Sequence, residues 1–554
     1  MSTYQKPSTI KKMTTYSSIL QVNPLRFTVL FILGILVFPL KVYSQNVEKK
    51  RPNILFIFPD QLRSDYIGGE DSNIVHTPNL DQIAREGALF SRAYSATPTC
   101  LPARAALMTG MAPWKNGLLS YAPMATKYKY QMPQMLRDAG YYTFATGKLH
   151  YKPIGSVALK VEPGELDNSK FMHGFHEIKL CEGWGHPQND YNIWFKEKAP
   201  DLKIDGTGLG PTDHRTGIYP YNDELHPTAW TANQAIDFIN DHASKDPFFL
   251  KVAFHRPHPP FDPPKRWLDF YKNREIPLAD VGKWSEDKFG KFNSIPSPEQ
   301  QLNAPRGNYS DSIVENARKG YYAAISFLDE QIGYILTALE KKGELENTLI
   351  VVSSDHGDMM GDHHLWRKSY PYEGSAAVPM IIRWPESIEL TADRGQVIKE
   401  LVELRDVLPT FLDVAGVAVP SEMDGMSMIP LIEGNNKGWR KVLDLEHGQC
   451  YWKENSWTGL TDERYKYIYY AVTGEEQLFD LLKDPKEKKN LANLSEYNKS
   501  LKRWRQKMID HLRDRGHKWV KDGKLVRRGE NIMFSPNYPK DYFPKEILNQ
   551  SIIK

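Results

Sequence analysis

Cysteine is scarce in this sequence of 554 residues, and its scarcity excludes a disulfide framework. Only Cys100, Cys181 and Cys450 are present, although Cys181 and Cys450 could still pair in an oxidising compartment. The chain also has no long basic run, no nucleic-acid-binding motif, no internal repeat and no low-complexity tract. Nucleic acid is therefore not an expected partner. The net charge of +3 argues neither for nor against a polyanionic partner.

No apolar run is long enough for an ordinary membrane span, but residues 1–44 have the pattern of an export signal. Lys11, Lys12 and Arg26 precede an apolar run over residues 27–40, which suits a signal-peptide core. Residues 42–45 offer a small-residue cleavage site without a cysteine, so a lipid anchor is not expected. The alternative is an uncleaved N-terminal anchor. In both cases we expect an exported protein, periplasmic, secreted or at the cell surface. With a cleaved signal, the protein would contact the membrane only during export.

The remaining chain has the composition of a soluble protein with more than one domain. Apolar residues make up 41% and charged residues 25% of the sequence, which are ordinary values. Buried strand patterns alternate with helical ones, which favours an α/β fold with a largely parallel sheet covered on both faces. Strands are expected at residues 52–60, 141–146, 247–254 and 348–353, and helices from 77 to 87, before 140, at 229–243 and at 311–342. The first of these helices is expected to begin with Thr77 as its cap and Pro78 in its first turn.

Two regions differ from this alternation. Residues 155–227 are rich in Gly, Asp, Pro, His and Trp with little periodicity, which is typical of a functional loop insertion. From about residue 431 the pattern changes to aromatic strands at 464–470 and 477–481 and a helix at 501–512. We therefore expect an N-terminal extension over residues 1–44, a main domain over 45–430, and a smaller α+β subdomain over 431–554.

The segment from Thr99 to Gly110 carries the most specific motif, Cys-x-Pro-x-Arg, at the start of a helical pattern. A helix N-terminus offers free N–H groups and a positive dipole end to an anion, and it lowers the pKa of a thiol. Arg104 adds a bidentate donor for an oxyanion. The motif indicates an activated Cys100 that faces an anionic substrate; the alternative is a structural cysteine that caps a surface helix.

Other chemistry-bearing residues follow the predicted strands. Two carboxylates, an amide and an imidazole could hold a divalent cation, while lysines could hold a tetrahedral anion and histidines could move protons. Alone, each could be a turn, loop or solvated surface residue. Ligands of such folds collect at the carboxyl ends of the strands. The residues are Asp60, Gln61, Lys148, His150, His258, Asp355, His356 and Lys368.

Together with Cys100, Pro102 and Arg104, this set resembles the type I, formylglycine-dependent sulfatases of the alkaline phosphatase superfamily, bacterial exported glycan sulfatases in particular. The resemblance covers about residues 52–385 and recurs at 403–417 and 461–491. It implies an α/β fold with a large mixed, mostly parallel sheet between helices, like that of alkaline phosphatase, and a C-terminal α+β subdomain with an antiparallel sheet. It also implies a maturation enzyme that converts Cys100 to formylglycine. Ala103 stands where that family most often has Ser.

The resemblance implies a role for each residue in a two-step covalent hydrolysis of a sulfate ester. Asp60, Gln61, Asp355 and His356 would be metal ligands, with modified Cys100 completing the shell. Arg104 would hold the formylglycine, Lys148 and Lys368 the sulfate. His150 would be the base that breaks down the sulfated hydrate, and His258 the proton donor to the leaving alcohol. Calcium is the expected ion, with magnesium or manganese next.

Gln61 and His356 depart from the commonest family pattern, which has Asp-Asp and Asp-Asn pairs. Two protein carboxylates rather than three should relax selectivity for calcium. Similar variants occur in choline-sulfatase-like enzymes and phosphonate monoester hydrolases. The leading hypothesis is a sulfatase for a carbohydrate ester, since Trp184, Tyr191 and Trp194 suit sugar stacking. The alternatives are a phosphonate monoester or phosphodiester hydrolase and, in another class, a non-catalytic sulfated-glycan-binding protein, which would need no base at His150.

Overall fold

The computed structural model describes residues 51–67, 74–151, 173–183, 189–291 and 303–539. They belong to one compact unit, residues 49–554. The expected signal peptide, residues 1–44, lies outside the described residues. Among those that are described, no helix has the length and apolar character needed to cross a bilayer. The expected boundary at residues 430 and 431 stays a prediction.

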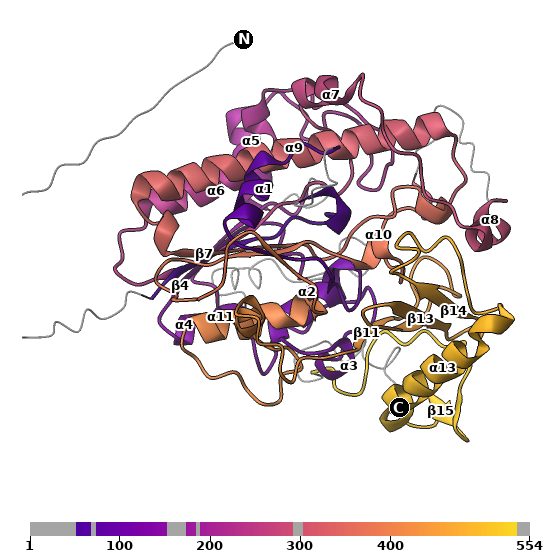
Figure 1. The fold of residues 1–554 in the computed structure, drawn as a ribbon. Helices are drawn as coiled ribbons and strands as arrows, with labels where there is room; N and C mark the ends of the chain where they lie inside the picture. Colours follow the sequence, from indigo (N-terminus) through magenta and orange to yellow (C-terminus); the bar gives the residue numbers. More distant parts are fainter. Residues whose placement is uncertain (1–50, 68–73, 152–172, 184–188, 292–302, 540–554) are drawn as a thin grey trace, which may run out of the picture. The chain divides into compact units, whose positions relative to one another are not determined.

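An eight-stranded mixed sheet forms the centre of this unit, in the order β5-β4-β6-β1-β7-β8-β2-β9 (Figure 1). The strands from β5 to β7 run parallel to one another, and β8 runs antiparallel to both β7 and β2. The strands are β1 (Asn53–Ile57), β2 (Ala88–Phe90), β4 (Tyr142–Gly147), β5 (Glu177–Leu180), β6 (Phe248–Ala253), β7 (Thr348–Ser353), β8 (Met380–Arg383) and β9 (Gln396–Ile398).

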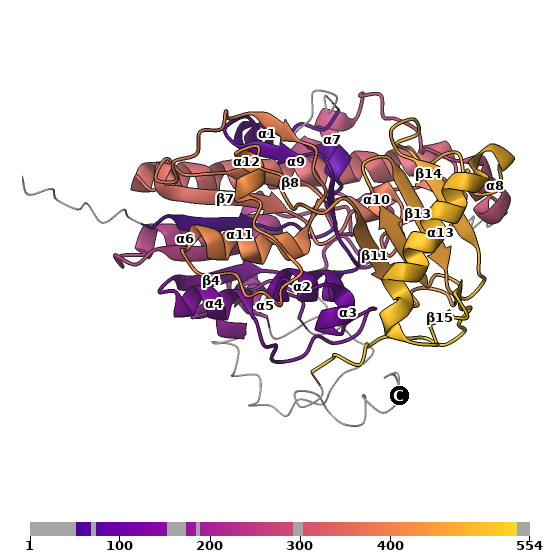
Figure 2. The same cartoon turned by 60° about the horizontal axis from the view of Figure 1, so that its bottom comes forward.

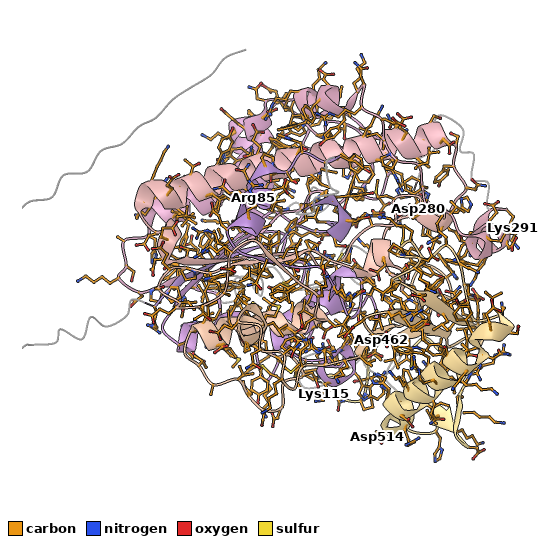
Figure 3. All side chains as sticks on the ribbon, in the orientation of Figure 1. Arg85, Lys115, Asp280, Lys291, Asp462 and Asp514 are labelled. Atoms are coloured by element: carbon orange, nitrogen blue, oxygen red, sulfur yellow. The ribbon has the colours of Figure 1, made fainter. Side chains whose placement is uncertain are left out.

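Helices cover both faces of this sheet, which explains why the central strands β1, β6 and β7 are buried throughout and largely apolar. In β1, Leu55 and Ile57 pack with α1 (Pro78–Arg85), α6 (Pro227–Asp241) and α9 (Asp311–Lys342). Ile54 and Phe56 pack on the other face with α2 (Cys100–Thr109), α4 (Met132–Asp138) and α11 (Val407–Val414). Figure 1 shows the two helix layers with the sheet between them, and Figure 3 shows that side chains fill the space between the layers.

Shorter elements complete the described chain. They are the helices α3 (Pro113–Asn116), α5 (Asp190–Lys198), α7 (Lys265–Tyr271), α8 (Lys283–Phe289), α10 (Glu373–Ala376) and α12 (Ile429–Ile432), the paired strands β3 (Ala93–Tyr94) and β10 (Val402–Glu403), and the hairpin of β15 (Val520–Lys521) and β16 (Lys524–Leu525).

The C-terminal part has its own antiparallel sheet, as expected. The strands β11 (Leu443–His447), β12 (Trp457–Thr461), β13 (Tyr465–Tyr470) and β14 (Glu476–Asp480) follow one another in sequence order. One face packs against α13 (Asn498–Leu512), which lies across these strands in Figure 2. The other face packs through Trp457 and Phe479 against Tyr372 and Tyr94. The second sheet is thereby fixed against the segments that follow β2 and β7.

The sequence located the long elements well and the irregular ones poorly. The helix predicted at residues 311–342 coincides with α9, and the strand at 348–353 coincides with β7. Residues 155–227, predicted to be loop, contain β5 and α5, while residues 152–172 and 184–188 lie outside the described residues. Strands β11 and β12 were not predicted, because neither has enough alternation to be recognised alone.

The start of α1 was predicted from Thr77 as a cap, but the structure shows a different cap. The Thr77 side chain donates to the Asp81 carboxylate and caps no backbone N–H. Instead Asp329 of α9 accepts from the backbone N–H groups of Leu80 (2.8 Å) and Asn79 (3.1 Å). A residue 249 positions away thus satisfies the free donors of this helix end.

We expect Asp329→Ala to lower the free energy of unfolding by about 2 kcal/mol, because two buried N–H groups lose their acceptor. Urea denaturation measures the change. Glu340→Ala, an exposed position on the same helix, should stay within about 0.5 kcal/mol of wild type. Equal small effects of the two substitutions would contradict the capping role.

Candidate active site

Four neighbouring parallel strands deliver the predicted site residues to one edge of the main sheet. Asp60 follows β1, Lys148 follows β4, His258 follows β6 and Asp355 follows β7, and these strands are adjacent in the order β4-β6-β1-β7. Each of the four residues is buried. The expectation that these side chains meet at the carboxyl ends of the strands is confirmed.

The turn after β4 depends on Gly147. Its φ is +96°, and a Cβ there would lie 2.0 Å from the carbonyl oxygen of Ala253 at the end of β6. Only glycine tolerates this close approach and conformation together. The next backbone N–H, that of Lys148, then donates to the same Ala253 oxygen at 2.6 Å. This local packing directs the chain of Lys148 and His150 into the site.

Cys100 is the first residue of α2, and it is buried rather than on a surface helix. Thr99 precedes it with an extended backbone, as an N-cap residue does. The expected lowering of the thiol pKa is wrong for this structure. Burial, and after it the Asp60 carboxylate, raise the pKa of Cys100 to about 11. At neutral pH the thiol is therefore protonated.

Arg104, one turn further along α2, bridges the two carboxylates of the site. Its guanidinium donates to Asp355 Oδ2 at 2.7 Å and to Asp60 Oδ2 at 3.0 Å. A further N–H donates to the carbonyl oxygen of Lys148 at 2.7 Å. The side chain is fully enclosed. Arg104 thus fixes the relative positions of β1, β4 and β7 at the site and offsets the buried negative charge.

Asp60, Cys100, Asp355 and His356 form a compact group of metal-ligating side chains. Their ligand atoms all lie within 4.8 Å of one another, and all four residues are buried. Asp60 Oδ1 is buried and has no hydrogen-bond partner among the described residues, which is costly unless something binds there. Two carboxylate oxygens, an imidazole nitrogen and a Cys100-derived atom suit a divalent cation.

Gln61, a predicted metal ligand, lies beside this group and makes other contacts. Its Oε1 accepts from Lys368 Nζ at 2.7 Å, and its Nε2 donates to Asp358. Its backbone N–H donates to Asp355 Oδ1 at 3.1 Å. Direct ligation by Gln61 stays a prediction, and the structure shows its side chain bound to Lys368.

Lys148 and Lys368 bring two ammonium groups to the site from opposite sides. Lys148 Nζ lies 2.6 Å from Asp60 Oδ2, and Lys368 reaches Gln61. Burial favours a raised pKa for Asp60, but the cationic side chains of Lys148 and Arg104 outweigh it and hold that pKa well below its usual value. Three cationic side chains, those of Lys148, Lys368 and Arg104, thus lie around the Asp60 and Asp355 carboxylates, which suits an anionic substrate.

His150 and His258 are both buried at the site and both neutral at neutral pH. Burial, together with Lys148, lowers the pKa of each histidine well below its usual value. His150 Nε2 lies 3.4 Å from the Tyr121 hydroxyl. His258 Nδ1 lies 2.8 Å from the carbonyl oxygen of Pro259, so Nδ1 carries the proton and Nε2 is an acceptor.

His255 is a site residue that the sequence reasoning missed. Its ring centroid lies 5.2 Å from that of His258, and it lines the same cavity. Arg256 donates to His255 Nδ1, and Asp262 holds Arg256 through two hydrogen bonds of 2.7 and 2.9 Å. Because a guanidinium only donates, the ring proton of neutral His255 is on Nε2. A histidine three positions before His258 was the available signal.

These groups surround a cavity of about 520 Å³. The sequence reasoning missed part of its wall because those residues come from loops without a motif. For Arg367, its position next to Lys368 was an available signal. The loop between β11 and β12, which contains Cys450 and Tyr451, offered no such signal. The missed residues include Thr99, Tyr121, Glu182, His255, Arg367, Cys450 and Tyr451.

Of the aromatic residues expected to stack on a sugar, the described ones, Tyr191 and Trp194, pack into a small core instead. Tyr191 is buried and packs with Phe195 and Trp230, and Trp194 is half-buried against the same cluster. Trp184 lies outside the described residues. The aromatics of α5 form a small core against α6, because a short helix needs an apolar face to pack. Cys181 belongs to this core, and both Cys181 and Cys450 are free thiols.

Comparison with known proteins agrees with this geometry. The sulfatase family model matches residues 52–417, and the model of the C-terminal region of N-sulphoglucosamine sulphohydrolase matches residues 361–514. The chain is 36% identical over 497 residues to an arylsulfatase of Clostridium perfringens, covering 86% of this chain and 98% of that one. It is 28% identical over 578 residues to an N-acetylglucosamine-6-O-sulfatase of Bacteroides thetaiotaomicron, covering 93% and 95%.

Two solved structures share the fold. The phosphonate monoester hydrolase of Agrobacterium radiobacter has a TM-score of 0.70 at 24% identity, covering 86% of this chain and all of that one. A structure in complex with its substrate, D-glucosamine-2-N,6-O-disulfate, has a TM-score of 0.63 at 24% identity, covering 84% and 98%. With the family model matching most of the main sheet and its site, this chain belongs to the sulfatase family and is a sulfuric ester hydrolase.

Proposed function

We propose that this sulfatase hydrolyses a sulfate ester of a carbohydrate. The nucleophile would be a formylglycine made from Cys100, and the site would bind a divalent cation, with calcium as the expected ion. The observation that carries the proposal is the position of Cys100. It lies at the N-terminus of α2, its sulfur is 3.2 Å from His356 Nε2, and it shares one buried group with Asp60 and Asp355. Export through residues 1–44 and conversion by a maturation enzyme belong to the same proposal.

The residues present fit both groups. Asp60, Asp355 and His356 would hold the cation, which supplies charge stabilisation for the non-bridging sulfate oxygens. A hydrated formylglycine supplies an oxygen nucleophile and a second hydroxyl, through which sulfate can be released without attack at sulfur. An unmodified thiol with a pKa of about 11 would be a poor nucleophile at neutral pH, because the thiolate is the reactive form.

The chain's own side chains would bind the ester and move the protons. Lys148 and Lys368 would hold sulfate oxygens, and Arg104 keeps Asp60 and Asp355 in place. Neutral His150 can accept a proton at Nε2, beside the Tyr121 hydroxyl. His258 would face the leaving oxygen with Nε2, since Nδ1 is used by the Pro259 carbonyl oxygen, and once protonated this atom would pass a proton to the alcohol. These are the acid and base roles of a two-step covalent hydrolysis.

A carbohydrate substrate is supported by the names of related proteins and by the size of the cavity. One relative is an N-acetylglucosamine-6-O-sulfatase, and one structural neighbour was solved with a disulfated glucosamine as its substrate. A cavity of about 520 Å³ is within the range of small-molecule sites. A sugar sulfate fits such a site.

A phosphorus ester is the second candidate, because a phosphonate monoester hydrolase has the same fold with a TM-score of 0.70. We expect kcat/KM for an aryl sulfate to exceed that for the matched aryl phosphonate monoester and phosphate diester. The release of sulfate through the second hydroxyl matters most when the intermediate resists hydrolysis. Assays of these three esters with one leaving group, at saturating metal, measure the preference. A higher value for a phosphorus ester would favour the second candidate.

Mass spectrometry of the peptide that contains Cys100 tests the modification directly. A mass that corresponds to formylglycine supports the proposed nucleophile and disfavours a non-catalytic glycan-binding protein. Unmodified Cys100 in a fully active protein would contradict the proposal. The material should come from cells that also activate another sulfatase, so that the maturation enzyme is known to be present.

A further inference from the structure

We propose that Arg367 forms a binding site, at the mouth of the active-site cavity, for a second anionic group of the substrate. This inference rests on the proposed function. The group would be a carboxylate or a second sulfate carried by the leaving sugar. Arg367 lines the cavity next to Lys368, and it is partly exposed while Lys368 and Lys148 are only 9% and 1% exposed. It therefore lies further out than the lysines proposed to hold the reactive sulfate.

Arg367 differs from the other arginines near the site because no carboxylate among the described residues pairs with it. Arg104 pairs with Asp60 and Asp355, and Arg256 pairs with Asp262. In Arg367, the Nε atom is buried without a hydrogen-bond partner in the described part of the chain. A half-buried guanidinium with an unused donor is suited to an oxyanion.

The guanidinium is nevertheless held in place. One terminal nitrogen donates to the carbonyl oxygens of Thr212 (3.4 Å) and Asn303, and the group lies over the Tyr451 ring, 5.7 Å from its centroid. Tyr451 itself is 38% exposed and lines the same cavity. These contacts orient the guanidinium but leave its charge uncompensated, since carbonyl oxygens and a ring face carry no net charge.

The backbone at this position supports a functional role. Arg367 has a φ of +69°, which is unfavourable for a residue with a Cβ. Its N–H donates to Asp358 Oδ1 at 2.9 Å, which helps to hold it. Gln61, His150, Ser369 and Tyr451, which line the same cavity, also have positive φ. Such strain persists where surrounding contacts determine the conformation, and it is found at ligand sites.

The chemistry of the leaving group follows from this arrangement. The reactive sulfate would be bound by Lys148, Lys368 and the metal-ligating group. The anion at Arg367 would therefore belong to a different part of the substrate. Glu182, on the β5 side of the cavity, accepts the N–H groups of Leu149 and His150 at Oε1 and suits sugar hydroxyls. The two sides together favour a sugar that carries hydroxyl groups and a second negative charge.

The test compares substrate pairs that share one sulfate ester and differ in a second charge. One pair is N-acetylglucosamine 6-sulfate and glucosamine 2-N,6-O-disulfate; the other is 4-nitrophenyl sulfate with and without a ring carboxylate. We expect Arg367→Gln to lower kcat/KM for the dianionic member at least about tenfold more than for the monoanionic member. Arg367→Lys should retain part of this preference, because it keeps the charge.

Arg306→Gln is the matched control. Arg306 is a partly buried arginine that lies over Trp452, 4.5 Å from the ring centroid, and lines a neighbouring cavity rather than this one. Its replacement should change the ratio of kcat/KM for the dianionic member to kcat/KM for the monoanionic member by no more than about twofold. Calorimetry on the Cys100→Ala protein, with and without Arg367→Gln, gives the corresponding ratio of affinities for the dianionic and monoanionic members in the absence of turnover.

Failure of this inference and failure of the proposed function are distinguishable. Absence of sulfate ester hydrolysis in the wild-type protein would overturn the proposed function, and the calorimetric ratio would still decide on Arg367. Equal effects of Arg367→Gln on both members of every pair, in rate and in affinity, would overturn the second anion site while leaving the sulfatase intact.

Discussion

Replacement of Cys100 by alanine is expected to reduce kcat by more than about 10⁴-fold while the protein still folds. Cys100 supplies the proposed nucleophile, and no other described side chain of the cavity occupies its position at the start of α2. The substitution removes one buried sulfur, so the loss of stability should stay near 1 kcal/mol. Turnover of an aryl sulfate and of a panel of sulfated sugars, together with the thermal midpoint, measures both effects.

Cys181→Ala is the matched control for this prediction. Cys181 is also buried and free, but it packs with Tyr191 and Trp230 away from the metal-ligating group. Its replacement should keep most of the activity at a similar cost in stability. Activity of the Cys100→Ala protein above a small percentage of wild type would rule out the covalent mechanism.

Removal of divalent cations is expected to lower the activity below about 1% of its starting value, because Asp60, Asp355 and His356 would then surround no positive metal charge. Asp60 Oδ1 would be left without a partner in its buried position. Thermal stability should fall as well, since a ligand that binds only the folded state stabilises it. Metal analysis of the purified protein, EDTA treatment and a thermal scan measure these changes.

Addition of calcium should restore both activity and stability, with magnesium and manganese as the next candidates. Asp355→Asn should raise the metal concentration needed for half-maximal activity, because one anionic ligand is lost. The Asp329→Ala protein is a useful comparison, since it is expected to lose stability without any change in its metal requirement. Full activity in a protein shown to be free of metal would contradict a metal-dependent site.

The sequence by itself located the candidate site residues, because strand ends can be recognised locally, and the resemblance to type I sulfatases supplied their proposed roles. Short apolar runs that end at Asp60, before His258 and before Asp355 predict buried parallel strands, and parallel strands bring their carboxyl ends to one edge. The motif from Cys100 to Arg104 added the helix start.

Only the tertiary structure decided which groups surround that set. The sequence predicted Thr77 as the cap of α1, but Asp329, from a helix far away in sequence, takes that role. Burial and Asp60 raise the pKa of Cys100, opposite to the effect of the helix end alone. Tyr191 packs into a core instead of facing a sugar. Each outcome depends on what lies opposite a residue in space, which periodicity does not encode.

The wall of the active-site cavity also combines residues located from the sequence with residues that only the tertiary structure brings there. Arg367 and Tyr451 come from segments far apart in sequence. They meet because the C-terminal sheet packs, through Trp457 and Phe479, against segments that follow strands of the main sheet. The sequence located the residues proposed to hold and cleave an ester, since these follow strand and helix ends. The packing of one sheet against segments of another decided what the leaving group contacts, because that wall is built from long-range contacts between loops.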